Sequence, residues 1–398
     1  MVGGTRSYET AKRMVEVGHE VHMISSWREP SSQEGWHVED VDGITVHWIP
    51  VPYKNAMSFG DRVRAFLKYA MSAGKRAADV GGDIIFATST PLTVALPAVY
   101  ASRKLRLPMV FEVRDLWPEL PIAIGAIKNP ILKMASRWLE RFAYRNSSAI
   151  IALSPGMAKG VIATGYPESR VQVIPNGCDN ELFSPNPERA QAFREQHPEL
   201  GDGPIVLYAG TFGKINGVSF LPELAARLAQ RHPSVRFVSI GDGAETQLVM
   251  DRSKALGVHQ VNYFQYPSKP KEVLIDAFQA ATVSMSLFVD LPEMWNNSAN
   301  KFFDTLASGT AVAINYKGWQ SDLIEKYDIG IVLGANIDEA ATRLGDFLDD
   351  MDVIKAKAER ANQLAMKRFD RDLLASKLIS VVEAAAERGL ETFKPKLW

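Results

Sequence analysis

Strand and helix patterns alternate along the whole chain, and this alternation restricts the fold more than any other feature. The strand-like runs are short and rich in Val, Ile and Phe, and amphipathic helices separate them. Such runs are typical of an α/β protein with parallel sheets whose two faces are both covered. The expected strands are 20–26, 44–52, 83–89, 108–115, 149–154 and 171–175, then 205–209, 236–240, 261–265, 283–288, 311–316 and 330–333.

The alternation occurs twice, which predicts two domains. At 398 residues the chain is long for one domain, and a Pro-, Asn- and Glu-rich segment at 184–204 is interpreted as a linker. We expect two doubly wound, Rossmann-like domains facing each other across a cleft, over residues 1–185 and 186–371. A C-terminal helix over about 372–398 is expected to pack back on the first domain. Ligands of such sheets bind at the carboxyl ends of the strands.

The first domain lacks an expected strand. A doubly wound domain normally starts with a central strand that runs into a glycine loop and a helix. Here Gly3 and Gly4 directly precede a helix pattern at 5–17, and two residues do not make a strand. We therefore expect a gap in the first sheet. We also expect that the natural protein starts upstream or that this half is less stable than its partner.

Composition excludes several classes of protein. Apolar residues make up 46% and charged residues 23% of the chain, which is ordinary for a globular protein, and the polar first residues predict no signal peptide. Cys178 is the only cysteine, which rules out an internal disulfide framework and favours a cytoplasmic location. Neither a metal-ligand motif nor a basic nucleic-acid-binding module is evident, so we expect no metal and no nucleic acid.

Basic residues gather in the first half of the chain. Residues 1–175 hold 21 Lys and Arg against 16 Asp and Glu, whereas residues 176–398 hold 24 against 30. Lys133, Arg137, Arg141 and Arg145 recur every fourth residue in a predicted helix and form one stripe. Two interpretations stay open: an ordinary solvated face, or a surface that meets anionic lipid head groups or a lipid-diphosphate acceptor.

The segment 297–309, NSANKFFDTLASG, places a lysine and an acid on one short predicted helix. Ser298 is expected to cap its start and Gly309 to end it. Lys301 and Asp304 are expected to point to roughly the same side. A helix start and a lysine attract phosphate, and an acid one turn on is placed to accept hydrogen bonds from ribose hydroxyls. The segment suits a nucleotide diphosphate, although an ordinary amphipathic helix explains it equally well.

Eight segments in order resemble one protein family and cover nearly the whole chain. They are GGTRSYETAKRMVEVGHEVHMIS, FEVRDLWPE, ERFAYR, IIALSPGM, VIPNGCD, YAGTFGKINGV, IGDGAE and NSANKFFDTLASGTAVAIN. Together they resemble the retaining family 4 glycosyltransferases, which have the GT-B architecture. The likeness is greatest to the WbuB-like branch that builds bacterial O-antigen, capsule and exopolysaccharide.

The resemblance implies two groups of site residues in the first half. Gly3 and Gly4 resemble the family's glycine loop, whose amides approach the donor diphosphate. Arg114 and Asp115 follow a strand at its carboxyl end, and many members have a histidine at the position of Arg114 that contacts the donor sugar. Because this chain departs from that pattern, the role left to Arg114 is to bind phosphate or sugar hydroxyls, oriented by Asp115. A structural pair that braces the strand end is the alternative.

Loops in the second half resemble the family's nucleotide-binding loops. Lys214 lies in GTFGKING, where members often place an arginine and a lysine on the diphosphate, but Thr211 and Asn216 occupy those two places. Lys214 is the candidate for the missing cation. Gly241 lies in a GDG loop near the nucleotide. Tyr266 falls just past a predicted strand, where the family's backbone commonly contacts the base.

The helix at 297–309 resembles the remainder of the donor site. The family frequently carries a Glu-x7-Glu motif, and Asp304 matches its second, ribose-binding acid. Lys301 resembles a lysine that many members of this branch use on the phosphates. Asn296 stands where the first acid belongs, so it or its neighbour is expected to bond the sugar hydroxyls. The helix start completes the predicted donor-binding set with Asn296, Asn297, Ser298 and Asn300.

The resemblance implies a glycosyltransferase (EC 2.4) that moves a sugar from a nucleotide-sugar donor to a glycan or undecaprenyl-linked acceptor. The expected donor is a UDP-sugar, and the transfer is expected to retain the anomeric configuration. The product belongs to cell-surface polysaccharide, made at the inner face of the cytoplasmic membrane. No cofactor or metal is implied, and the candidate catalytic residues are Arg114, Asp115 and Lys301. Two alternatives stay open: a non-hydrolysing UDP-sugar epimerase of the same architecture, and a non-catalytic scaffold that binds UDP-sugar or a partner enzyme.

Overall fold

A computed structural model describes residues 6–27, 34–52, 57, 59–89 and 91–388. The chain divides into two compact units, each described here by itself. The N-terminal unit holds the described residues up to Ile174 and those from Ala375 on, and the C-terminal unit holds Pro175–Leu374. Among the described residues, no helix combines the length and the apolar character needed to cross a membrane.

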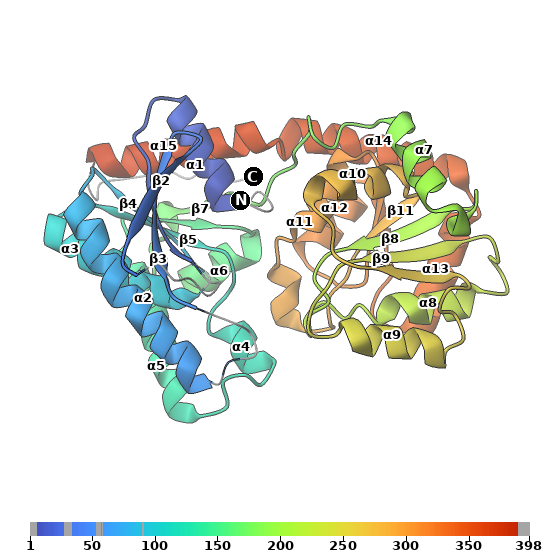
Figure 1. Ribbon diagram of the computed structural model, residues 1–398, viewed down its shortest axis with the longest axis horizontal. Coiled ribbons are helices and arrows are strands. Elements are labelled where there is room, and N and C mark those ends of the chain that lie inside the picture. The colour runs from blue at the N-terminus through green and yellow to red at the C-terminus, as the bar shows by residue number, and fades with distance from the viewer. Residues whose placement is uncertain (1–5, 28–33, 53–56, 58, 90, 389–398) are drawn as a thin grey trace. The chain divides into compact units, whose positions relative to one another are not determined.

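The C-terminal unit contains one sheet of six parallel strands (Figure 1). The strand order is β10-β9-β8-β11-β12-β13. These strands are β8 (Ile205–Ala209), β9 (Arg236–Ile240), β10 (Tyr263–Tyr266), β11 (Val283–Ser286), β12 (Ala311–Ile314) and β13 (Gly330–Val332). The helices are α7 (Pro187–Gln196), α8 (Phe220–Leu228), α9 (Thr246–Ala255), α10 (Lys271–Ala280), α11 (Asn300–Ala307), α12 (Trp319–Tyr327), α13 (Ile337–Leu348) and α14 (Met351–Arg368). Short 3-10 turns lie at Pro198–Leu200 and Pro292–Asn296.

Helices cover both faces of this sheet, as the pattern of β11 shows. Val283 and Met285 join the core cluster that α8 and α13 supply. Ser284, which points the other way, accepts a 2.9 Å hydrogen bond from Thr305 of α11. These strands are buried along their whole length: β8 (IVLYA) and β12 (AVAI) are largely apolar, whereas β11 (VSMS) alternates apolar residues with serine. The predicted doubly wound architecture is confirmed for this unit.

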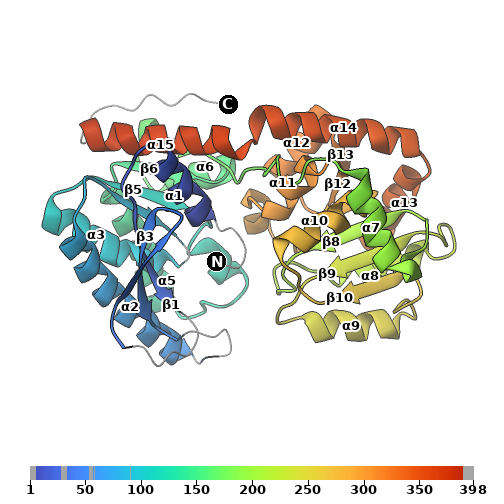
Figure 2. The same ribbon diagram turned by 45° about the horizontal axis from the view of Figure 1, so that its top comes forward.

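The N-terminal unit is also built from helices packed on sheets, but it contains two sheets. Its strands are β1 (His22–Trp27), β2 (His37–Val41), β3 (Ile44–Pro50), β4 (Ile85–Thr88), β5 (Met109–Val113), β6 (Ala149–Ala152) and β7 (Val171–Val173). Its helices are α1 (Arg6–Glu16), α2 (Phe59–Val80), α3 (Ala95–Leu105), α4 (Glu119–Ala123), α5 (Pro130–Arg145), α6 (Pro155–Ala163) and most of α15 (Arg371–Arg388). Two 3-10 turns lie at Leu92–Val94 and Glu168–Arg170. Figure 2 shows α15 near α1, and His19 after α1 lies 3.1 Å from Glu383 of α15.

The predicted gap in the first sheet is present among the described residues. One sheet has the order β1-β3-β2 and the other β4-β5-β6-β7, with no described strand joining β1 to β4. β4, β5, β6 and β7 are parallel, whereas β2 and β3 form an antiparallel hairpin. Asp42 and Gly43 connect that hairpin with positive φ values of 53° and 80°. The Asp-Gly pair is a strong sequence signal for such a turn, and the sequence analysis missed β2 by overlooking it.

The interpretation of 184–204 as a linker was wrong, because α7 occupies much of it. The Asn186 side chain accepts hydrogen bonds from the amides of Glu188 and Arg189 at 2.9 and 3.2 Å and so caps the helix. Pro187 takes the first helical position, where a missing N–H costs nothing. Arg189 then pairs with Asp276 of α10 at 2.8 Å. The Pro, Asn and Glu that suggested a loop are here the start signals of a helix. Prediction also missed α4, α12 and α13.

Candidate functional site

The order of the strands fixes where a ligand is expected in the C-terminal unit. From β8 the chain moves outward through β9 to β10, then returns to the other side of β8 with β11. The crevice outside the carboxyl ends of β8 and β11 is therefore the switch point at which doubly wound sheets bind ligands. The candidates Lys214, Gly241 and Asn296–Asn300 lie in the loops that follow β8, β9 and β11. They share this edge of the sheet although 82 residues separate Lys214 from Asn296.

Glycines allow the loops after β8 and β9 to touch. A Cβ atom at Gly241 would lie 1.9 Å from the carbonyl oxygen of Gly210, and one at Gly243 would lie 2.5 Å from the carbonyl oxygen of Phe212. A Cβ atom at Gly210 would lie 3.0 Å from Cε of Lys301. Gly241 therefore has a structural reason to be glycine. Through Gly210, the loop after β8 also approaches the lysine of α11.

Lys301 lies at the switch point itself. Its Nζ is 4.9 Å from the ring centre of Tyr208 on β8 and 5.0 Å from that of Phe288, which follows β11. It also lies 3.4 Å from the Tyr208 hydroxyl. Aromatic faces stabilise an ammonium group without neutralising it. Lys301 forms no ion pair with any described Asp or Glu, so its positive charge is available to a ligand.

The electrostatics of Lys301 favour an anion at this position. Loss of hydration on burial lowers its pKa to about 8, although part of the side chain stays exposed. The ammonium form is thus present at pH 7 but costs free energy. A bound anion offsets that cost, because an opposite charge nearby favours the protonated lysine. The site is charged and incompletely compensated before any ligand arrives.

Asp304 lies in a separate charged group, three residues further along α11. Burial raises its pKa to about 6, while Lys271 and Arg371 lower it and Asp179 raises it. Lys271 pairs with Asp179 at 3.2 Å, and Arg371 lies 3.5 Å from the same carboxylate. Lys301 contributes no resolved effect to the pKa of Asp304. The two residues therefore have different neighbours, although both are partly exposed.

Only the N-terminal end of α11 differs from the prediction. Ser298 does not cap the helix: the cap position is Ala299, without a side-chain bond. The hydroxyl of Ser298 instead accepts a 3.1 Å hydrogen bond from the amide of Asn176, which holds it away from the helix amides. At the other end Gly309 has φ 62°, and the amide of Thr310 bonds to Thr305 at 3.3 Å, as in a helix that ends on glycine.

The asparagines before α11 shape the loop. The side-chain oxygen of Asn297 accepts a 3.1 Å hydrogen bond from the amide of Ala299, and its side-chain nitrogen donates to the carbonyl of Met294. The main-chain carbonyl of Asn297 accepts a 2.6 Å hydrogen bond from the indole of Trp319. Its amide is therefore largely committed within the protein. Asn296 is partly exposed and Asn300 is exposed.

Tyr266 and Lys214 come from different elements: Tyr266 ends β10, and Lys214 lies in the loop after β8. Tyr266 is the last residue of β10 rather than a residue past it, and its carbonyl accepts from Gly241 at 3.1 Å. Its hydroxyl donates to Glu199 at 2.5 Å, so its side chain is engaged there. Lys214 is exposed.

A buried carboxylate, Glu112, lies two residues before the candidate Arg114 in the N-terminal unit. Glu112 on β5 accepts from Arg6 at 2.7 Å and from Thr88 at 2.8 Å. The backbone of Arg114 donates to Ser89 at 3.0 Å, and its guanidinium forms no ion pair with a described residue. The alternative interpretation, an Arg114–Asp115 pair that braces the strand end, is thus not among the ion pairs of the described residues. Gly3 and Gly4 lie outside the described residues.

Sequence reasoning missed the residues that define these environments. Tyr208 and Phe288 flank Lys301, but both appeared only as apolar members of strands. Asp179 belongs to the quoted segment VIPNGCD, so the resemblance contained it without assigning it. Lys271 and Arg371 start helices far along the chain, and no local pattern relates them to Asp304.

Comparison with known proteins identifies the enzyme class. The family model described as a glycosyl transferase 4-like domain matches residues 3–177, and the model described as glycosyl transferases group 1 matches residues 190–368. The chain belongs to the glycosyltransferases. The predicted transferase class is therefore confirmed.

Relatives and solved structures agree with this assignment. The chain is 26% identical to the D-inositol 3-phosphate glycosyltransferase of Corynebacterium urealyticum over 95% of this chain and 90% of that protein. The structure of Anabaena Alr3699/HepE in complex with UDP and glucose superposes with a TM-score of 0.67 at 18% identity, over 86% of this chain and 87% of that one. The structure of WaaG, described as a glycosyltransferase involved in lipopolysaccharide biosynthesis, gives 0.71 at 15% identity over 95% of each chain. The predicted GT-B fold is confirmed.

Proposed function

We propose that this glycosyltransferase transfers a sugar from a UDP-sugar to a glycan or lipid-linked glycan with retention of configuration. One observation carries the proposal: Lys301 is a cation without a described acidic partner at the switch point of the C-terminal sheet. A donor diphosphate supplies the negative charge that this position lacks. The Anabaena structure, described as a complex with UDP and glucose, supports UDP as the nucleotide to test first.

Each candidate residue has a defined task in this proposal. Lys301 donates to the diphosphate, and Lys214 on the exposed loop after β8 adds a second positive charge. Asp304 accepts hydrogen bonds from the ribose, since a carboxyl with a pKa of about 6 is mostly ionised at pH 7. Tyr208 holds the lysine through its hydroxyl and its ring. Asn300, which is exposed, and Asn296, which is partly exposed, are the proposed partners of the sugar hydroxyls.

The chemical step needs positioning and charge stabilisation rather than a protein nucleophile. As the bond from the sugar to the diphosphate breaks, negative charge grows on the leaving oxygen. The leaving diphosphate takes the proton of the acceptor hydroxyl, which attacks from the same face and so retains the configuration. Lys301 stabilises the growing charge, and a preorganised donor of this kind typically contributes about 10²–10³ in rate. Arg114 and Asp115 remain candidates for a part in this step.

The biological setting proposed is cell-surface polysaccharide synthesis, the role of the WbuB-like branch that the sequence resembles. The neighbour named WaaG, described as involved in lipopolysaccharide biosynthesis, supports that setting. An undecaprenyl-linked acceptor places the enzyme on the inner face of the cytoplasmic membrane. We propose that no metal takes part: among the described residues, no three His, Cys, Asp or Glu side chains are grouped as ligands.

A nucleotide screen followed by a transfer assay tests the proposal. UDP-sugars should raise the melting temperature more than GDP- or dTDP-sugars, because a ligand that binds the folded state stabilises it by mass action. Released UDP should then depend on a lipid-linked or glycan acceptor. Conversion of a UDP-sugar without UDP release would show an epimerase instead. Stabilisation by UDP without turnover on any acceptor of a panel would favour the scaffold.

A further inference from the structure

A second charged surface lies in the N-terminal unit and includes none of the residues assigned above. Two adjoining recesses of about 880 and 810 Å³ lie beside α5, the first along its whole length and the second at its C-terminal end, and they share Arg103, Arg141, Arg145 and Asn146. Neither recess is lined by an Asp or Glu. We define the α5 surface by six of its cations: Arg103, Arg106, Lys133, Arg137, Arg141 and Arg145.

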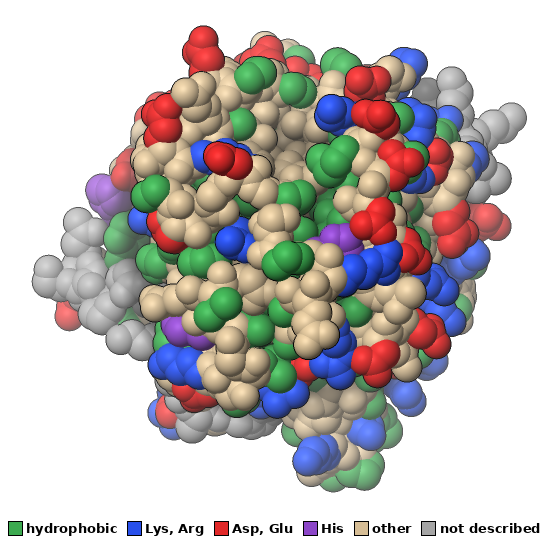
Figure 3. All heavy atoms as spheres, turned by 90° about the vertical axis from the view of Figure 1, so that its right-hand side faces the viewer, with side chains coloured by type: hydrophobic (Ala, Val, Ile, Leu, Met, Phe, Trp, Pro, Cys, Tyr) green, Lys and Arg blue, Asp and Glu red, His purple; other side chains and the backbone are tan. Residues whose placement is uncertain are grey.

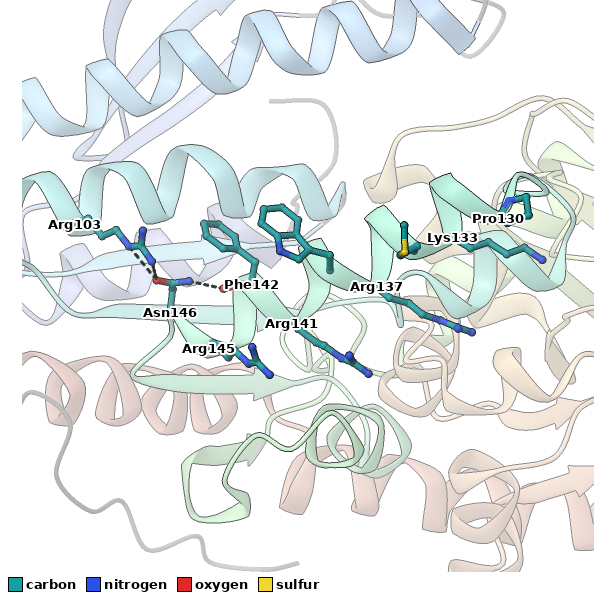
Figure 4. Close-up of a pocket in the computed structure, with 10 residues that line it drawn as sticks. Arg103, Pro130, Lys133, Arg137, Arg141, Phe142, Arg145 and Asn146 are labelled. Atoms are coloured by element: carbon teal, nitrogen blue, oxygen red, sulfur yellow. Dashed lines mark hydrogen bonds between the residues drawn. The ribbon is translucent and has the colours of Figure 1, made fainter.

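The charge of the α5 surface is only partly offset within the described part of the chain, where buried Glu140 lies near Arg137 and Arg141. None of the six cations forms an ion pair with a described acid. Arg103 is instead held by neutral partners: it donates to Asn146 at 3.1 and 2.7 Å and lies 5.7 Å from the ring centre of Phe142 (Figure 4). By contrast, acidic and basic side chains are mixed over the face of the C-terminal unit in Figure 3. Concentrated charge of one sign attracts an external polyanion.

The four cations of the stripe point to one side of α5. In Figure 4 the side chains of Lys133, Arg137, Arg141 and Arg145 extend from one flank of the helix, and Phe142 extends from the opposite flank. This arrangement follows from their spacing of four residues. The helix itself is held by its buried face, where Tyr144 is only 2% exposed. The stripe is thus presented on a firmly packed helix.

Large apolar side chains are exposed on the same helix. Ile131 is 68% exposed, Met134 67% and Trp138 60%. Trp138 stacks on Phe142 with ring centres 5.1 Å apart and planes 18° apart, which fixes its orientation. Exposed aliphatic and indole groups beside a basic stripe are the composition of helices that lie in the interface of a bilayer. Tryptophan is enriched at that depth because it has an apolar body and one polar group.

We propose that the α5 surface docks this chain onto an anionic phospholipid bilayer. The arginines contact lipid phosphates, and Ile131, Met134 and Trp138 enter the boundary between head groups and acyl chains. RNA satisfies the cations equally well but leaves the exposed aliphatic side chains in water, so the bilayer explains both halves of the surface. The proposal does not depend on the donor or on the reaction, since it uses none of the residues assigned to them.

Vesicle sedimentation of the full chain without nucleotide sugar tests this docking. The chain should bind vesicles of phosphatidylcholine with about a third phosphatidylglycerol, and release as salt is raised from 0.05 to about 0.5 M. Each cation near an anionic surface strengthens binding roughly fivefold. The double variant Arg141→Glu, Arg145→Glu should therefore weaken binding by at least about tenfold. The matched variant Lys355→Glu, Lys367→Glu, which reverses two exposed lysines on α14, should leave it within about twofold.

The apolar half has its own variant. The double variant Met134→Ser, Trp138→Ser keeps every charge. A loss of vesicle binding in this variant would therefore show that apolar side chains insert into the bilayer, in addition to the electrostatic attraction of the cations. Melting temperatures of all variants should match the parent, because the altered side chains are exposed. Equal binding to pure phosphatidylcholine vesicles, or full binding by the Arg141 and Arg145 variant, would overturn the proposal. Tight binding to single-stranded RNA with none to anionic vesicles would identify a different partner and overturn it as well.

Discussion

Replacing Lys301 by Met removes the ammonium while keeping a side chain of similar length between Tyr208 and Phe288. The pKa of Lys301 is about 8 in the folded chain against 10.5 for the free side chain. The unfolded state therefore binds more protons between pH 8 and 10.5, and stability rises with pH across that window. Below pH 8 the full cost of the buried charge is present. At 1.36 kcal/mol per pKa unit that cost is at most about 3 kcal/mol, and partial exposure reduces it.

The variant is thus expected to be at least as stable as the parent without ligand, yet to bind UDP poorly. Loss of a charge-assisted hydrogen bond costs about 1.5–3 kcal/mol, or roughly 10- to 150-fold in affinity. Turnover should fall by about 10²–10³. Titration calorimetry at several pH values measures this directly. The parent should lose about tenfold in UDP affinity between pH 7 and 9, as a group with a pKa of about 8 deprotonates, and Lys301→Met should show no such loss.

The matched control is Lys355→Met, an exposed lysine on α14 that should change neither affinity nor its pH profile. The reasoning fails if Lys301→Met binds UDP as tightly as the parent. It also fails if the pH profile survives the substitution, because the titrating group would then lie elsewhere. A fall in the melting temperature of the unliganded variant would show that Lys301 supports the fold rather than the ligand.

Four further predictions follow from the contacts. Gly241→Ala should destabilise the C-terminal unit by about 1–3 kcal/mol in urea unfolding, because its Cβ would lie 1.9 Å from the carbonyl of Gly210; Gly213→Ala, whose Cβ meets only side-chain atoms, is the milder control. Burial raises the pKa of Glu140 to about 7 from 4.5, so the folded state binds more protons and stability should fall as pH rises through this window. Glu140→Gln should remove up to about 3 kcal/mol of that dependence, and an unchanged pH profile of stability would contradict it. Because burial raises the pKa of Asp304 to about 6, UDP affinity should fall as pH drops below 6, and Asp304→Asn should weaken binding about tenfold and flatten that limb. EDTA should leave transfer unchanged, whereas activity lost to EDTA and restored by Mg²⁺ would reveal a metal.

The central strands were predictable because they are buried on both faces. β8 and β9 have the bounds expected from their apolar runs, 205–209 and 236–240. β11 was expected to continue to 288 but ends at Ser286. Phe288 is buried outside the ladder, where its amide bonds to the Asn315 side chain at 3.0 Å and its ring meets Lys301. An apolar run does not distinguish a strand from a buried loop that leaves the sheet.

The candidate site was predictable in part, through Lys301 and the glycine loops. Residues that share an edge of a parallel sheet follow from the order of strands and loops alone. Their surroundings depend on tertiary contacts: Tyr208 and Phe288 lie 93 and 13 residues from Lys301 in the chain. Ser298 shows the same limit, since its hydroxyl bonds to Asn176, 122 residues away, instead of capping its own helix. Local signals compete with distant partners that a single sequence does not reveal.

A crystal structure of the chain with UDP tests the central claim most directly. The diphosphate should lie outside the carboxyl ends of β8 and β11, with an oxygen within about 3 Å of Nζ of Lys301 and the ribose against Asp304. UDP bound elsewhere, or a diphosphate that leaves Nζ of Lys301 without contact, would contradict the account.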